Sequence, residues 1–476
     1  MAEKEKPDEV LDKLRDQINR APGYLSDDED DDILGPDASQ KFMECERLEF
    51  KDLAALDGPK VAAVLMVKNE KKRIHVSLES ALGVACCFII FDTGSEDDTK
   101  EIIKGHCSKH KINLYMIEGN FVDFSTSRNC LLDYADTVPV DFLLLMDCND
   151  ELREGRELLE YARKELETDT TAYLICQQWW SGNLDYYWNS RFVKPRKGWR
   201  FRYPVHEFMD HPTESFPSTK IPDRVVLYQD RTQDDDKTGK RFVKDKAFLR
   251  REYRKNHRDG RTVFYLAQTY SCLGDWSRTY RFYKERYDIL DGFWEERYIS
   301  AHRCGRAGER IGLEWEACHE WYLKSYAICD WAEPLLSIAQ HYDKEKVWSL
   351  SYMYARQACE LSFPSQCSLF IDKKVYDYDR YSKLGIVAYY YNKYADGKWA
   401  VEKALAFKPD SEVDKRNLRF YLDKEKEIAE SKARTLTKSD YFKLRGEKLR
   451  TENPRIRPSQ IAQKIKLEWK MKSLKL

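Results

Sequence analysis

Four short apolar runs between residues 61 and 146 constrain the fold of this 476-residue chain more than any other feature. Each run is five to seven residues long. Such runs are typical of strands buried in a sheet. The runs are Val61–Val67, Cys87–Phe91, Asn113–Ile117 and Phe142–Met146. Segments with helical spacing separate them: Lys71–Leu82, Asp97–His106 and Thr126–Tyr134. This alternation predicts an α/β fold in which helices wrap a parallel sheet.

The carboxyl ends of three of these runs are polar. The residues that follow them are Lys68-Asn69-Glu70, Asp92-Thr93-Gly94 and Asp147-Cys148-Asn149-Asp150. Parallel sheets bind ligands beyond the carboxyl ends of their strands, so a binding site is expected at this edge. An ordinary turn is the alternative interpretation of Asp92, and a helix start is the alternative for Asp147–Asp150.

The charges of the chain are unevenly distributed, although the formal net charge is only -1. Residues 1–40 carry 13 acidic and 5 basic side chains, and this proline-containing segment is expected to be disordered. Residues 431–476 carry 14 basic and 4 acidic side chains. A length of 476 residues leaves room for two or three domains between these charged segments.

The sequence predicts a cytoplasmic protein. It contains no apolar run long enough to span a bilayer, and MAEKEKPDEV lacks the apolar stretch of a secretory signal. The 13 cysteines are scattered without any CxxC pair, which indicates reduced thiols inside apolar segments rather than a cysteine–zinc cluster.

Two further regions follow the alternating segment. Residues 171–230 are rich in Trp, Tyr, Pro and Gly, and are expected to complete a first domain over residues 58–240. A helical pattern then covers residues 245–430. Ala267 and Ala301 stand in similar contexts 34 residues apart, which is the period of tetratricopeptide repeats. An irregular helical bundle is the alternative interpretation.

Some of the polar residues are suited to a divalent cation. A reaction that releases a nucleoside diphosphate develops negative charge, which a divalent ion neutralises. Asp147 directly follows a predicted strand and Asn149 comes two residues later, so both oxygens could reach one ion. His206, in the segment YPVHEF, is the best candidate for a third ligand. A structural histidine is the alternative, and is the more common role for a lone histidine.

Other residues are candidates for acid–base and phosphate chemistry. Glu207 neighbours His206 and could act as a general base toward a hydroxyl, with Asp150 as its competitor. Arg128 and Arg191 are suited to phosphate oxygens. A surface ion pair is the alternative role for Arg191.

Six segments in order carry a resemblance to a known family. They are MVKNE (66–70), FDTGSEDDT (91–99), FSTSRN (124–129), LLLMDCNDEL (143–152), SRFVKP (190–195) and PVHEF (204–208). Together they resemble the family 2 glycosyltransferases, particularly the branch fused to tetratricopeptide-like repeats. The resemblance implies a GT-A nucleotide-sugar-binding domain followed by an all-α helical-repeat domain.

The resemblance also implies an activity and a set of roles. It implies an inverting transfer from a nucleotide-sugar, with a UDP-sugar as the expected donor, to a hydroxyl of a glycan or protein acceptor, with Mn²⁺ or Mg²⁺ as cofactor. The donor-binding residues would be Lys68, Asn69, Glu70, Asp92, Arg128, Asn129 and Arg191. Where the family has a second aspartate in its Asp-x-Asp motif, this chain has Asn149, whose amide oxygen is a weaker ligand.

Two rival functions remain open. The first is a GT-A-like scaffold with a weakened metal site, which would use its repeats and basic tail for binding. Such a scaffold would be free to lose Asp147, His206 and Arg191, whereas this chain has all three. A nucleotidyltransferase would be expected to have a glycine-rich phosphate loop after the first strand, and MVKNEKKR contains no glycine.

The basic segment of residues 441–472 predicts two helices separated at Asn453-Pro454. An apolar seam would join them, formed by Phe442, Leu449, Ile456, Ile461, Ile465 and Trp469. The segment resembles the first two helices of HMG-box or YABBY-type DNA-binding modules. A solvated docking helix is the alternative, and an anionic partner, either nucleic acid or a membrane surface, would suit its charge.

Overall fold

The computed structural model describes residues 39–180, 184–213, 219–230, 237–365 and 371–473, together with Leu34, Ser215, Cys367 and Leu369. These residues form two compact units, residues 1–318 and 319–476, which are considered separately. Nearly all of the acidic segment 1–40, which is expected to be disordered, lies outside the described residues.

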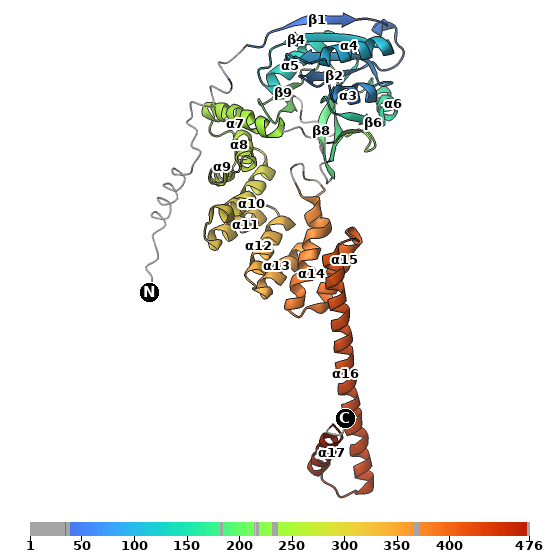
Figure 1. The fold of residues 1–476 in the computed structure, drawn as a ribbon, viewed down its shortest axis with the longest axis vertical. Coiled ribbons are helices and arrows are strands. Elements are labelled where there is room, and N and C mark those ends of the chain that lie inside the picture. Colours follow the sequence, from blue (N-terminus) through green and yellow to red (C-terminus); the bar gives the residue numbers. More distant parts are fainter. Residues whose placement is uncertain are drawn as a thin grey trace, which may run out of the picture. The chain divides into compact units, whose positions relative to one another are not determined.

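A mixed sheet of nine strands forms the centre of the first unit, in the order β1-β4-β3-β2-β5-β8-β7-β11-β6 (Figure 1). Its strands are β1 (Phe42–Leu48), β2 (Val61–Val67), β3 (Ala85–Asp92), β4 (Asn113–Gly119), β5 (Phe142–Met146), β6 (Glu151–Arg153), β7 (Ala172–Trp180), β8 (Leu184–Val193) and β11 (Val226–Asp230). A separate hairpin pairs β9 (Arg200–Arg202) with β10 (Phe208–Asp210).

The parallel part of the sheet confirms the fold class predicted from the apolar runs. Strands β4, β3, β2 and β5 are neighbours and run parallel. The helices between and after them are α3 (Ile74–Ser80), α4 (Thr99–His110), α5 (Phe124–Ala135) and α6 (Gly155–Glu165). The antiparallel edge strand β1 was not predicted, because its residues FMECERL are polar and mostly exposed.

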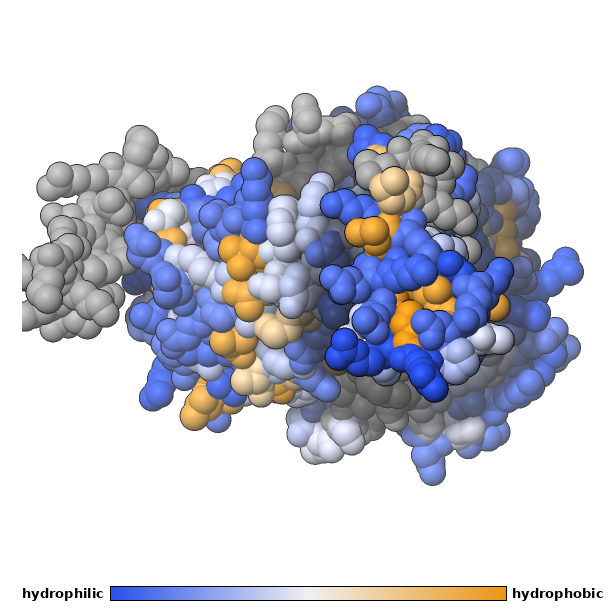
Figure 2. All heavy atoms as spheres, turned by 90° about the horizontal axis from the view of Figure 1, so that it is seen from below, coloured by the Kyte–Doolittle hydropathy of each residue, from blue (hydrophilic) through white to orange (hydrophobic). Residues whose placement is uncertain are grey.

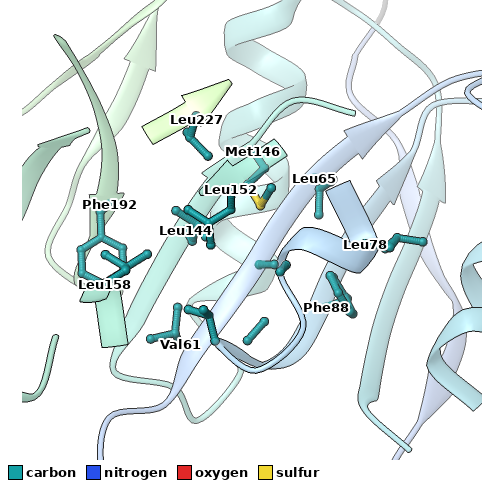
Figure 3. Packing of buried hydrophobic residues seen from close by; sticks show 14 of the residues in the cluster. Val61, Leu65, Leu78, Phe88, Leu144, Met146, Leu152, Leu158, Phe192 and Leu227 are labelled. Carbon is teal, nitrogen blue, oxygen red and sulfur yellow. The ribbon is translucent and has the colours of Figure 1, made fainter. Parts of the chain in front are cut away.

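The sheet buries both of its faces. Alternate residues of β2 belong to different cores: Leu65 packs with α3, α4 and α6 on one face (Figure 3), whereas Val64 packs with α5 and the β9–β10 hairpin on the other. A strand buried on both sides needs a continuous apolar sequence rather than an alternating one. This explains why these runs were recognisable in the sequence.

A run of helices follows the sheet, and from α7 to α10 each helix packs against the next one along the chain. They are α7 (Lys237–Lys255), α8 (Gly260–Cys272), α9 (Trp276–Asp288), α10 (Trp294–Ile311) and α11 (Trp315–Ile328), and the division between the two units falls within α11. Ala267 on α8 and Ala301 on α10 are both fully buried. The repeat-like small residues therefore lie where helices pack together, as in tetratricopeptide-like hairpins.

The second unit continues the helical pattern. Its further elements are α12 (Ala332–Lys344), α13 (Trp348–Glu360), η2 (Val375–Asp379), α14 (Arg380–Tyr390), α15 (Tyr394–Phe407), α16 (Glu412–Glu452) and α17 (Pro458–Ser473). A Cβ atom on Gly385 would lie 2.5 Å from Val401, and one on Gly397 would lie 2.0 Å from the Tyr421 hydroxyl. Glycine at these two positions permits the close approach of α14, α15 and α16.

The basic segment forms two helices that separate at Asn453, as predicted. Leu449, Ile461 and Ile465 are buried between α16 and α17, and Arg445 forms a two-point ion pair with Glu468 across the hairpin. Helix α16 runs without a break from residue 412 through 431 to 452, so repeats and tail share one helix.

The coloured part of the face drawn in Figure 2 is mostly hydrophilic, with separate hydrophobic areas. None of the described helices combines the length and apolar character needed to cross a membrane. All 13 cysteines lie within the described residues and are free thiols, most of them buried as predicted.

Candidate active site

The polar strand ends meet at one edge of the sheet. Val67 at the end of β2 pairs with Asp92 at the end of β3, and Leu65 pairs with Met146 at the end of β5. The residues that follow these three neighbouring strands therefore lie at a single edge. This is the position at which parallel sheets bind ligands.

Asp147 is the centre of a network of ion pairs at this edge. Its Oδ1 accepts a hydrogen bond from Nη2 of Arg128 at 2.7 Å, and its Oδ2 accepts one from Nη2 of Arg191 at 3.2 Å. Nε of Arg128 also donates to Oε1 of Glu207 at 2.9 Å. Four residues that the sequence analysis selected from separate segments thus form one network, with two cations balancing two carboxylates.

Burial strengthens the electrostatic coupling of this network. Although burial alone would raise the pKa of Asp147, the charges of Arg191 and Arg128 hold it well below its ordinary value. Burial alone would lower the pKa of Arg191, and the charge of Asp147 instead raises it. The side chains of Arg128 and Arg191 are only 11% and 8% exposed, and the neighbouring carboxylates keep both of them charged. This is the environment in which fixed cations stabilise phosphate charge most effectively.

Asp150 lies next to this network but both of its carboxylate oxygens are occupied. Oδ2 accepts a hydrogen bond from the backbone N–H of Asp147, and Oδ1 accepts one from Nε2 of Gln229 on β11. Burial, together with the charge of Asp147, raises the pKa of Asp150 to about 7. Asp150 therefore holds the turn after β5, and Gln229 is a supporting residue that the sequence did not reveal.

His206 and Glu207 lie on a bent segment between β9 and β10. Tyr203 and His206 have φ angles of 72° and 53°, in the left-handed region. This bend allows neighbouring side chains to serve one site, which an extended strand would prevent. Glu207 is 14% exposed and turns toward Arg128.

Helix α8, the second helix after the sheet, supports His206. The imidazole stacks on Tyr265 of α8 at 4.0 Å between ring centroids. Arg261 of α8 donates to the carbonyl oxygen of His206 at 2.8 Å. Burial, followed by the charges of Arg261 and Arg241, lowers the pKa of His206 to about 3, so the ring is neutral near pH 7. Sequence analysis missed Arg261 and Tyr265, because they lie beyond the expected domain end at residue 240.

Asp92 is fully buried and organises the turn after β3. Its Oδ1 accepts hydrogen bonds from the backbone N–H groups of Gly94 and Ser95, at 2.9 and 2.7 Å. Its Oδ2 has no hydrogen-bond partner among the described residues. A buried carboxylate oxygen without a partner is costly, which favours a ligand that donates a hydrogen bond at this point.

The segment after β2 is tied to the turn after β3. The backbone N–H of Asn69 donates to Oγ of Ser95 at 2.9 Å, and Oδ1 of Asn69 accepts from the backbone N–H of Glu96 at 2.8 Å. Glu70 forms an ion pair with Arg73 at 3.4 Å, and Lys68 is exposed. Of these three predicted donor-binding residues, Asn69 is the one whose side chain contacts the turn organised by Asp92.

Asn129 uses its side chain within the protein. Nδ2 donates to the carbonyl oxygen of Phe201 at 2.9 Å, and Oδ1 accepts from the N–H of Phe201 at 2.7 Å. This two-point contact holds β9 against α5. The structure thus places Asn129 beside the site, where it positions the segment that carries His206 and Glu207.

The residues proposed for a metal differ in their present contacts. Asp147 is bound by two arginines, whereas Asn149 is half-buried and its side chain has no hydrogen-bond partner in the described part of the chain. His206 instead contacts Tyr265 and Arg261 of α8, and it has no contact with Asp147 or Asn149 among the described residues. By chemistry alone, the three residues would offer a carboxylate oxygen, an amide oxygen and an imidazole nitrogen. This donor chemistry fits Mn²⁺ better than Mg²⁺, which prefers oxygen ligands alone.

Comparison with known proteins gives a family match for part of the chain. Residues 63–221 match the model of the family described as glycosyl transferase family 2. Search of the curated proteins gives no match. The matched segment contains every predicted site residue, and it identifies residues 63–221 as a family 2 glycosyltransferase domain. The family supports glycosyl transfer as the general chemistry of this domain.

Solved structures with a partial likeness include both glycosyltransferase and repeat proteins. S. aureus TarS 1-349 in complex with UDP has 13% identity and a TM-score of 0.26, over 63% of this chain and 91% of that one. TTC0263, a tetratricopeptide repeat protein of Thermus thermophilus, has 14% identity and a TM-score of 0.27, over 39% of this chain and 93% of that one. TM-scores this low carry no argument about function.

Proposed function

We propose that this chain transfers a sugar from a nucleotide-sugar, with a UDP-sugar as the expected donor, to a hydroxyl of a glycan or protein, with inversion at the anomeric carbon. The observation that carries the proposal is the network of Asp147, Arg128, Arg191 and Glu207 at the carboxyl edge of a family 2 glycosyltransferase domain. The network supplies charges for the leaving diphosphate and a carboxylate for the acceptor.

The arginines suit the leaving group. Cleavage of the bond between sugar and diphosphate places negative charge on phosphate oxygens, and buried guanidinium groups stabilise that charge as it develops. Arg128 and Arg191 lie within hydrogen-bonding distance of the same carboxylate, so a diphosphate near Asp147 would be within reach of both. Their positive charges also explain how a diphosphate could be held at a site that contains carboxylates.

A divalent ion would complete the donor site. Asp147, Asn149 and His206 would hold it, and Mn²⁺ or Mg²⁺ bound there would act as a Lewis acid toward the diphosphate. Because two guanidinium groups face Asp147, an ion alone would meet electrostatic repulsion. We therefore expect tight ion binding only when nucleoside diphosphate is present.

Donor recognition is proposed at the turn after β3. The free, buried Oδ2 of Asp92 would accept a hydrogen bond from an N–H of the base, and Asn69 and Glu70 would border the nucleoside. Lys68, which is exposed, would attract the negatively charged donor from solvent. Asn129 would act indirectly, through its hold on Phe201.

Glu207 is proposed as the general base. It would remove the proton of the acceptor hydroxyl while that oxygen attacks the anomeric carbon, opposite the leaving diphosphate. Asp150 is less suited, because its two oxygens already accept hydrogen bonds from the backbone of Asp147 and from Gln229. The proton would pass to Glu207, and the bonding electrons of the broken bond would leave with the diphosphate.

The remaining parts of the chain are proposed to recruit the acceptor and to bind an anionic partner in the cell. We divide the chain into an acidic tail (1–40), a catalytic domain (58–240), helical repeats (245–430) and a basic tail (431–476). The repeats would recruit a glycan or protein acceptor. The tail would bind an anionic partner, either nucleic acid or a membrane surface, and the free thiols suit a cytoplasmic location.

The proposal is tested with the purified full-length chain, Mn²⁺ and a panel of UDP-, GDP- and dTDP-sugars. Release of nucleoside diphosphate from one donor, lost in Arg191→Ala, is expected. The anomeric configuration of the product, read by NMR, should be inverted relative to the donor. Absence of hydrolysis and of nucleotide binding for every donor would favour the rival interpretation of a binding scaffold.

A further inference from the structure

Three potential metal ligands lie together on the face of the sheet covered by α3 and α4. They are Glu79 of α3 and His106 and His110 of α4, and their ligand atoms all lie within 4.8 Å of one another. Nδ1 of His106 is 3.5 Å from Oε1 of Glu79, and Nε2 of His110 is 3.8 Å from the same oxygen. The sequence analysis did not single out any of these three residues.

Helix geometry explains why these side chains converge. His106 and His110 are four residues apart on α4, so they project from the same face one turn apart. Their ring centroids are 4.6 Å apart. Helix α3 packs against α4 and brings Glu79 to the same place. Two histidines one helical turn apart, with a carboxylate from another element, form the ligand arrangement of known zinc sites.

Within the described part of the chain, one ring nitrogen of each histidine is left unused. Nε2 of His106 and Nε2 of His110 are buried and have no hydrogen-bond partner in the part of the chain that the structure describes. The distances to Glu79 are longer than those of good hydrogen bonds.

We propose that Glu79, His106 and His110 bind a transition-metal cation of the Zn²⁺ class at a site separate from Asp147. Ligand atoms about 2.0–2.1 Å from a tetrahedral zinc ion are about 3.3 Å apart, so the observed 3.5 and 3.8 Å require only small side-chain movements. The Glu79 side chain is 53% exposed, which leaves space for water as a fourth ligand.

The position of the cluster indicates a structural role. Helix α4 begins after β3, at the edge that carries Asp92, and runs back toward the start of β4. His110, the last residue of α4, therefore lies toward the opposite edge of the sheet from Asp147. A cation there would fasten α3 to α4, and two imidazole ligands would select Zn²⁺ over Mg²⁺.

The experiment measures Zn²⁺ binding to the full-length chain, purified without a histidine tag, by calorimetry and by thermal unfolding. It is done in the Asp147→Asn background, so that an ion at the proposed catalytic site does not contribute. One Zn²⁺ should bind and raise the melting temperature. His106→Gln and His110→Gln should each weaken this binding by at least about tenfold. His257→Gln, which alters an exposed histidine outside the cluster, should have no effect.

Other outcomes would overturn the site. Unchanged Zn²⁺ affinity in both His106→Gln and His110→Gln excludes the cluster, as does a wild-type chain that binds no Zn²⁺. If the wild-type chain binds one Zn²⁺ and the Asp147→Asn single variant binds none, the ion belongs to the proposed catalytic site at Asp147 and not to the cluster. His110 is more exposed than His106, with 27% against 8% of the side chain accessible, so His110→Gln keeps the test valid if His106→Gln misfolds. None of these results depends on glycosyl transfer.

Discussion

Arg128 binds Glu207 through Nε at 2.9 Å, and its Nη2 at the same time binds Asp147 at 2.7 Å. The guanidinium of Arg128 thus joins Asp147, which is proposed to bind the donor, to Glu207, which is proposed to act on the acceptor. A diphosphate that attracts Arg128 would loosen its hold on Glu207. Donor binding would then leave Glu207 with less compensating positive charge, which makes it a better base.

Glu207→Gln tests the role of the base. The amide keeps the size of the side chain and its acceptor oxygen toward Arg128, but it cannot take up a proton. We expect kcat to fall by roughly 10²–10⁴ while donor affinity changes little. Steady-state kinetics and calorimetric titration with nucleoside diphosphate measure the two effects separately.

Asp150→Asn is the matched control for that variant. Asp150 holds the backbone of Asp147 and the side chain of Gln229, so its loss should lower stability and donor affinity together. Near-normal kcat in Glu207→Gln, with a selective loss of kcat in Asp150→Asn, would assign the base to Asp150 instead.

Asp147→Ala should destabilise the protein even without metal or donor. The substitution leaves Arg128 and Arg191 buried without their shared carboxylate. Breaking a buried ion pair on one side typically costs about 3–5 kcal/mol. Because 29% of the Asp147 side chain is exposed, we expect the lower end of that range. Urea unfolding in EDTA measures it, and an unchanged midpoint would contradict the network as a stabilising feature.

The apolar runs made the sheet predictable, because strands buried on both faces have continuous apolar sequences. Val61–Val67 and Phe142–Met146 begin and end where the structure has β2 and β5. Strand β1 escaped prediction for the opposite reason. It lies at an edge, and its side chains are mostly exposed. It also depends on pairing with the distant strand β4, for example Glu46 with Met116.

The site was predictable only in part. Strand ends identified Asp92 and Asp147, because the edge at which parallel strands end follows from their direction. Partners from other elements could not be found in this way. Gln229 lies on β11 and Arg261 on α8, and neither has a local pattern that indicates its contact with Asp150 or His206. Such residues become visible only when the chain is folded.

Asn149→Asp tests the metal site by a substitution that should increase the affinity for Mn²⁺. A carboxylate replaces a neutral amide that has no hydrogen-bond partner among the described residues, so Mn²⁺ should bind more tightly in the presence of nucleoside diphosphate. We expect about a tenfold gain, because ligand charge is a main determinant of affinity for hard cations. Calorimetry with Mn²⁺ measures it. Equal affinity in both proteins would place the ion away from Asn149.

Asp245 on α7 offers a test of electrostatics through pH. Its side chain is buried, and Nε of Arg241 is 3.7 Å from its Oδ2. Burial raises its pKa from 3.8 to about 6, with a contribution from Glu207 that Arg241 opposes. A carboxyl group whose pKa is higher in the folded protein than in the unfolded chain stabilises the fold at a pH below the pKa of the unfolded chain. This stabilisation is lost as the pH rises through the pKa of the folded protein.

Asp245→Asn removes this ionisation and should therefore stabilise the protein at neutral pH relative to acidic pH. A pKa change from 3.8 to about 6 corresponds to at most about 3 kcal/mol between about pH 4 and about pH 8. Urea unfolding of both proteins at the two pH values measures this difference. Asp133→Asn is the control, because 60% of the Asp133 side chain is exposed. The free energy of unfolding of Asp245→Asn could differ from that of the wild type by the same amount at both pH values. That result would show that Asp245 does not titrate in this range in the folded protein.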